Sequence, residues 1–149
     1  MKMKNLCLLF IILSSYLVSC QSPLVRQNLT FLKYFNHQFP NITLKDKALI
    51  FLIPDKYCSS CQKTFESIKV ILKSTRNVYI ISGAGGKQVS IGENITYLTD
   101  KKSAFEKLNL GISGAGLVVI DDRKISKIME VNSFNELQLF ELLQNYNKK

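Results

Sequence analysis

The chain has 149 residues, 46% of them hydrophobic, and a formal net charge of +9 at pH 7. This length and composition are those of one domain of ordinary size with a hydrophobic core. The basic residues are scattered singly or in pairs, with no long run and no interleaved aromatic patch, which argues against nucleic-acid binding. The charge favours solubility and a weak attraction to an anionic membrane instead.

The first twenty residues have the pattern of an export signal. Lys2 and Lys4 precede an apolar stretch over residues 6–18, which is shorter than the about 20 apolar residues of a membrane-spanning helix. The stretch ends in Leu17-Val18-Ser19-Cys20, which resembles the bacterial lipobox. The resemblance implies cleavage before Cys20 and a diacylglyceryl group on this cysteine. An ordinary secretory signal with a chance cysteine and an uncleaved anchor are the alternatives.

The signal divides the chain into three predicted parts. These are a lipoprotein signal peptide over residues 1–19, a tether and N-terminal extension over residues 20–40, and a domain over residues 41–149. Gln21 follows the lipidated cysteine, where Asp would mark inner-membrane retention in enteric bacteria, and this implies the outer membrane. We therefore expect a lipid-anchored protein of the bacterial cell envelope that faces the periplasm.

The first half of the chain predicts one buried strand and one long helix. Residues 21–30 are polar with one proline and predict a tether, and residues 30–39 are compatible with a short helix. The continuous apolar run over residues 48–53 is typical of a buried central strand. Residues 58–74 predict an amphipathic helix, because Phe65, Ile68, Ile71 and Leu72 share one face.

The middle of the chain predicts shorter elements. Residues 77–81 predict a strand, and the glycine-rich residues 82–86 a flexible loop. That loop lacks the lysine and hydroxyl pattern of a phosphate-binding loop. A short strand over residues 95–98, a short helix over residues 102–109 and a glycine-rich turn over residues 111–116 follow.

The chain is expected to end in a hairpin and a helix. Residues 117–120 predict a buried strand and residues 124–131 its half-exposed partner, with Asp121 and Asp122 in the turn between them rather than in a metal site. Ser133 and Glu136 form an S-x-x-E capping box for the last helix. The order is therefore β-α-β followed by β-β-α, so a parallel pair with a right-handed crossover is joined by antiparallel strands.

One pair of cysteines remains in the mature domain. Cys7 lies in the signal and Cys20 is the predicted lipidation site, which leaves Cys58 and Cys61 in a compartment that permits disulfides. They lie one helical turn apart at the start of the predicted helix. The helix N-terminus, together with Lys56, is expected to lower the pKa of Cys58. Cys58 is the predicted nucleophile and Cys61 the resolving thiol.

Residues 48–131, extending toward Tyr146, resemble the thioredoxin-like fold. Three segments carry the resemblance: the strand leading into Cys-Ser-Ser-Cys, the helix that follows, and GISGAGLVVIDDRKI, which is similar to the segment opposite the cysteines in that family. The resemblance implies a three-layer α/β/α sandwich with a mixed central sheet. The nearest likeness is to exported or membrane-anchored bacterial thiol–disulfide proteins.

Three positions depart from the family pattern. Tyr57 stands where the family usually has Trp before the first cysteine. No proline precedes the strand over residues 117–120, and Ala115 or Gly116 stands where the family has a cis-proline. The strand over residues 48–53 also lacks the buried acid of many thioredoxins. We expect Lys56, Tyr57, Ala115 and Gly116 to be neighbours of the redox site.

The leading hypothesis is thiol–disulfide exchange on exported proteins through Cys58 and Cys61, without a bound cofactor. Its expected partners are exported protein thiols or disulfides, a membrane thiol redox partner and the membrane itself, and not nucleic acid. The first alternative, motivated by the missing proline, is a non-catalytic binding or assembly lipoprotein with a structural disulfide. A cysteine-based metal-delivery site is the second alternative, although the only histidine, His37, lies upstream of the domain.

Overall fold

The computed structural model describes residues 23–56, 59–85, 92 and 94–148. The predicted signal, the lipidation site Cys20, Tyr57 and Cys58 lie outside the described residues. The elements, in chain order, are α2 (Pro23–Gln38), β1 (Ala48–Ile53), α3 (Ser59–Leu72), β2 (Val78–Gly83), β3 (Ile95–Asp100), the 3-10 helix η1 (Ala104–Lys107), β4 (Gly116–Asp121), β5 (Lys124–Glu130) and α4 (Glu136–Asn147). None of the helices in the described part of the chain is long and apolar enough to cross a bilayer.

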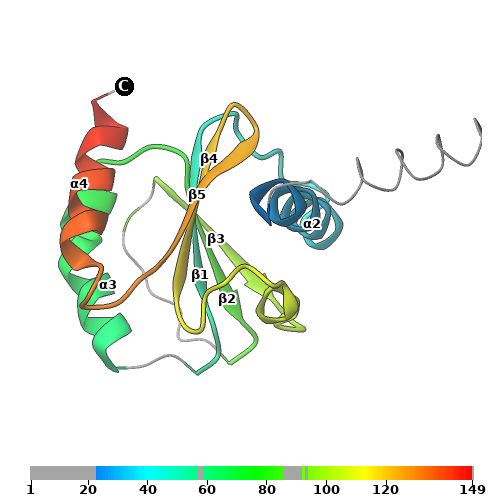
Figure 1. Ribbon diagram of the computed structural model, residues 1–149, viewed down its shortest axis with the longest axis horizontal. Helices are drawn as coiled ribbons and strands as arrows, with labels where there is room; N and C mark the ends of the chain where they lie inside the picture. The colour runs from blue at the N-terminus through cyan, green and yellow to red at the C-terminus, as the bar shows by residue number, and fades with distance from the viewer. Residues whose placement is uncertain (1–22, 57–58, 86–91, 93, 149) are drawn as a thin grey trace, which may run out of the picture.

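The five strands form one mixed sheet in the order β3-β2-β1-β4-β5 (Figure 1). Strands β1, β2 and β3 are parallel, whereas β4 is antiparallel to both β1 and β5. Strand β1 is central, and Ile50 is aligned with Tyr79 of β2 on one side and with Val118 of β4 on the other. The predicted strand over residues 48–53 and the parallel pair that it forms with the next strand are confirmed.

Helices cover both faces of this sheet (Figure 1), and β1 supplies side chains to both cores. Because successive side chains of a strand point to opposite faces, Leu49, Phe51 and Ile53 pack toward α3 and α4. The Phe51 and Phe65 rings meet edge to face, with 5.5 Å between centroids. The alternate residues Ala48, Ile50 and Leu52 pack toward α2. The predicted three-layer α/β/α architecture is confirmed, and the continuous apolar run is explained by burial on two sides.

The structure corrects the expectation that residues 21–30 are a tether, because residues 23–30 are the first turns of α2. Pro23 is the first helical residue, where its missing N–H costs no hydrogen bond. Three buried aromatic side chains, Phe31, Tyr34 and Phe35, attach the helix to the sheet. The Tyr34 hydroxyl also donates to the buried Asp100 Oδ2 at 2.9 Å. Burial, followed by this carboxylate, raises the pKa of Tyr34. The N-terminal extension is thus part of the folded unit.

Two local predictions near helix ends are also wrong. The helix expected over residues 102–109 is the single 3-10 turn η1. Helix α4 begins at Glu136, and its N-cap is Asn135, whose side chain makes no capping hydrogen bond. The Asn132 Oδ1 accepts from the N–H groups of Phe134 and Asn135, so it orders the turn that precedes the helix. Glu136 accepts from the Ser67 hydroxyl of α3 at 2.7 Å, so this acid joins the two helices rather than completing a capping box.

Candidate redox site

Cys61 lies in the first turn of α3, directly after the central strand and its short connection. It is disulfide-bonded and only 4% exposed. Its neighbours in the core between the sheet and the α3–α4 layer include Phe65, Ala115 and Val131. The described structure therefore places a disulfide sulfur at the point where the sequence predicts the redox motif.

A shallow pocket of about 370 Å³ lies beside Cys61. Four segments that are distant in the sequence line it: the end of the β1 connection, the start of α3, the approach to β4 and the residues after β5. The described lining residues are Lys56, Ser60, Cys61, Ser113, Gly114, Ala115, Glu130, Val131, Asn132 and Phe134. The pocket brings together three of the predicted site residues, Lys56, Cys61 and Ala115.

The approach to β4 passes over the disulfide. A Cβ atom built on Gly114 would lie 3.6 Å from Cys61 Sγ, so the backbone at Gly114 passes close to the sulfur. Ala115 directly precedes β4, and its carbonyl accepts from the Val131 N–H at 2.8 Å. Gly116 is the first residue of β4, and a Cβ there would meet Ile112 Cδ1 at 2.3 Å. Gly116 is therefore held against Ile112 and is not among the pocket's lining residues.

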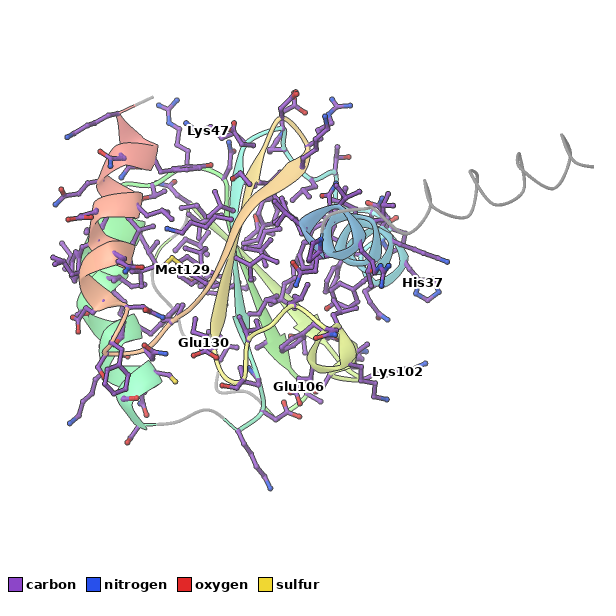
Figure 2. The ribbon with its side chains drawn as sticks, viewed as in Figure 1. His37, Lys47, Lys102, Glu106, Met129 and Glu130 are labelled. Carbon is purple, nitrogen blue, oxygen red and sulfur yellow. The ribbon has the colours of Figure 1, made fainter. Side chains whose placement is uncertain are left out.

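Glu130 lies at the end of β5 (Figure 2) and holds the segment that approaches Cys61. Its Oε1 accepts from the backbone N–H and from the hydroxyl of Ser113, each at 2.7 Å. Its Oε2 accepts from Asn132 Nδ2 at 2.9 Å. The pKa of Glu130 is lowered, first by the Ser113 backbone N–H and then by the Ser113 hydroxyl. Sequence reasoning missed Glu130, although pairing of the predicted hairpin would have placed it opposite Gly116.

Asp55 fixes the opposite side of the connection that leads to the cysteines. Its Oδ1 accepts from the Gly85 N–H at 2.8 Å, and its Oδ2 from the Ser103 hydroxyl at 2.9 Å. A Cβ atom on Gly83 would lie 2.2 Å from Asp55 Oδ1, so any larger residue here would displace the Asp55 carboxylate. The loop expected to be flexible from residue 82 onward thus begins as strand through Gly83 and is tied to a carboxylate at Gly85.

The rim of the pocket includes an exposed aromatic side chain and an exposed cation. Phe134 is 93% exposed although it is a large aromatic residue. Lys56 is exposed on the rim contributed by the β1 connection.

The described residues contain no group of three or more His, Cys, Asp and Glu side chains that would hold a metal ion. His37 is exposed on α2, on the other side of the sheet (Figure 2). Asp121 ends β4, and Asp122 and Arg123 form the hairpin turn with positive φ values of 51° and 59°. The Arg123 guanidinium pairs with Asp46. Asp121 and Asp122 thus belong to a hairpin turn.

The strand order, the antiparallel β4–β5 pair and the helices on both faces define a thioredoxin-like fold. No protein-family model matches the chain. No curated protein matches it either. Among solved structures, the chain is similar to the solution structure of an uncharacterized thioredoxin-like protein from Porphyromonas gingivalis. The identity is 14% and the TM-score 0.45, over 69% of this chain and 76% of that one.

Proposed function

We propose that the mature chain is a lipid-anchored envelope protein that exchanges disulfides with other exported proteins through Cys58 and Cys61. The observation that carries the proposal is the disulfide at Cys61, in the first turn of the helix that follows the central strand. We infer that Cys58 is its partner, because a spacing of three residues puts two side chains on the same side of a helical turn.

The surroundings of Cys61 support different roles for the two cysteines, with Cys58 as the nucleophile and Cys61 as the resolving thiol. Cys61 is buried against the sheet, as suits a thiol that reacts only with its neighbour. A nucleophile has to meet its substrate, and the pocket beside Cys61 is open and has an exposed aromatic rim. The cation of Lys56 and the N-terminus of α3 favour a thiolate at Cys58.

The exchange balances without any further group. In the reducing direction, the Cys58 thiolate attacks one sulfur of a substrate disulfide and releases the other as a thiolate. Cys61 then loses its proton and attacks the Cys58 sulfur, which breaks the mixed disulfide and releases the second substrate thiol. Two electrons and two protons pass to the substrate, and a Cys58–Cys61 disulfide remains. A membrane thiol protein restores the dithiol, and the same steps in reverse oxidise a substrate.

The location follows from Cys20. Its diacylglyceryl group anchors the chain to the periplasmic side of the envelope, most simply to the outer membrane. Two acyl chains on one residue hold a protein stably, whereas a single chain binds only marginally. The partners are then exported proteins that carry disulfides or free thiols, and no bound cofactor is needed.

Two cysteine variants test the exchange. The Cys61→Ser protein should accumulate a mixed disulfide with a disulfide-containing peptide, whereas the matched Cys58→Ser protein should not. The pH dependence of alkylation in Cys61→Ser should give a Cys58 pKa below the usual value of about 8.5. A pKa of about 8.5 or above, together with no trapped adduct, would contradict the proposal.

A second function is favoured by the packing of Cys61 as a core residue. In this alternative the chain is a non-catalytic binding or assembly lipoprotein, and its disulfide only braces the start of α3. Ala115 in place of proline is consistent with this role. The Cys58→Ala protein would then lose stability without any change in thiol–disulfide exchange by cells that carry it.

A further inference from the structure

The outer side of α2 carries exposed apolar residues that the fold does not use. Val25 and Leu29 are 45% and 60% exposed. The opposite side of the same helix buries Phe31 and Phe35 completely against the sheet. Burial on the sheet therefore explains only one side of α2, and the outer side exposes apolar surface to solvent.

The same outer side is positively charged. Helix α2 contains Arg26 and Lys33 and no acidic residue. Val25, Leu29 and Lys33 follow one another at intervals of four residues, and Arg26 lies three residues before Leu29, so the four side chains are neighbours on the helix surface. Leu29 and Lys33 also line one shallow depression together with His37. We call Val25, Arg26, Leu29 and Lys33 the outer α2 face.

Apolar and cationic side chains on one helix face are the combination that binds the interface of an anionic membrane. The apolar groups enter the boundary between headgroups and acyl chains, while the cations pair with lipid phosphates. An acidic protein surface could also attract these cations. It is less favoured here, because the predicted acylated residue, Cys20, comes only three residues before Pro23. The helix is thereby held beside a bilayer.

We propose that the outer α2 face lies in the headgroup layer of an anionic membrane, an inference that rests on the proposed lipid anchor at Cys20. Helix α2 is the outermost layer on one side of the sheet, and α3 and α4 cover the other side (Figure 1). Contact through the outer α2 face therefore turns the α3–α4 layer, with Cys61 in its first helix, away from the bilayer. The pocket beside Cys61 then opens toward partners in the aqueous space.

The test uses the acylated mature chain, purified from bacterial membranes and placed in vesicles that contain a photoactivatable phospholipid. Lipid adducts are mapped by mass spectrometry, and their yield in residues 23–38 is compared with that in residues 59–72. With phosphatidylglycerol in the vesicles, adducts should concentrate in α2. Since each basic residue near an anionic surface contributes about 1 kcal/mol, reversal of two charges in Arg26→Glu/Lys33→Glu should lower the α2 yield about tenfold or more.

The matched control is Lys63→Glu/Lys73→Glu, which makes the same charge change at two exposed residues on the other side of the sheet. It should leave the α2 yield unchanged. Equal yields in the two helices, or an equal loss in both double variants, would overturn the proposal. Unchanged circular dichroism of each variant shows that it is folded.

The lipid anchor and thiol exchange are measured separately on the same preparation. An intact mass without the diacylglyceryl group would disprove the anchor, and a failed mixed-disulfide trap would disprove the exchange. Neither result depends on where lipid adducts form. If the chain is not acylated, the same comparison of α2 adducts at higher vesicle concentration still decides whether the outer α2 face binds an anionic surface.

Discussion

Ser113 donates two hydrogen bonds to one oxygen of Glu130, from its backbone N–H and from its hydroxyl, each at 2.7 Å. These bonds connect the approach to β4, which passes Cys61 at Gly114, to the end of β5. The position of the segment opposite the disulfide thus depends on a carboxylate outside the cysteine motif. Glu130 is therefore a positioning residue for this segment.

Replacing Glu130 by Gln should destabilise the protein by about 1 kcal/mol at neutral pH, because a charge-assisted bond becomes a neutral one at a partly exposed site. The pKa of Glu130 in the folded chain lies below its ordinary value of 4.5, so folding favours the ionised form. This contribution is present above the ordinary pKa and is lost as the pH falls through the folded-state pKa. Urea unfolding of both proteins at several pH values measures it.

The difference in unfolding free energy between the parent protein and Glu130→Gln should therefore become smaller at acidic pH. A difference in unfolding free energy that is constant from neutral pH to well below the ordinary pKa of Glu130 would show that the charge is irrelevant. The rate at which Cys58 is alkylated in the reduced variant should also change, since the segment beside Cys61 is less firmly held. Glu66→Gln is the control, because Glu66 is exposed on α3 and pairs with Lys69.

Elements were predicted correctly from the sequence where the order of apolar and polar residues along the segment reflects which side chains are buried. Strand β1 was predicted with its observed bounds, because Ala48–Ile53 is apolar at every position and is buried on both faces. The β4–β5 hairpin was predicted from its buried and half-exposed strands. The first turns of α2 were missed because residues 23–30 are polar or exposed. Their helix is stabilised by aromatic residues further along and by contacts that no local pattern reveals.

The same distinction holds at the site. Cys61 was identified from the spacing of a motif in the chain. Glu130 was missed because its role depends on pairing with Gly116 across a hairpin and on contact with Ser113. Asp55 was missed because its partners, Gly85 and Ser103, are 30 and 48 residues away. Residues that hold the site together through contacts between distant segments are thus visible only in three dimensions.

The packing of α2 predicts a large stability effect at its inner side. Phe31→Ala should lower the free energy of unfolding by about 3–5 kcal/mol, because it empties a fully buried aromatic position. Leu29→Ala, on the outer side, should change it by no more than about 0.5 kcal/mol in the absence of membranes. Thermal or urea unfolding measures both. Similar small effects for the two variants would mean that the N-terminal extension is a tether after all.

The close approach of Gly83 to Asp55 predicts a second contrast. Gly83→Ala should cost about 1–3 kcal/mol, because its methyl group would collide with the Asp55 carboxylate and force a shift. In Gly85→Ala the new methyl group would lie 3.7 Å from Asp55 Cγ, an ordinary contact. That variant should remain within about 0.5 kcal/mol of the parent. Unfolding curves that rank the two variants in the opposite order would contradict the geometry at this connection.

The central claim is that the disulfide at Cys61 cycles in thiol–disulfide exchange. Its most direct test is the reduction potential of the Cys58–Cys61 couple in the mature chain, measured by equilibration with glutathione or dithiothreitol buffers. Exchange-active pairs have potentials of about −270 to −120 mV, and we expect a value in this range. A potential below about −300 mV, as structural disulfides have, would contradict the account and favour the non-catalytic alternative.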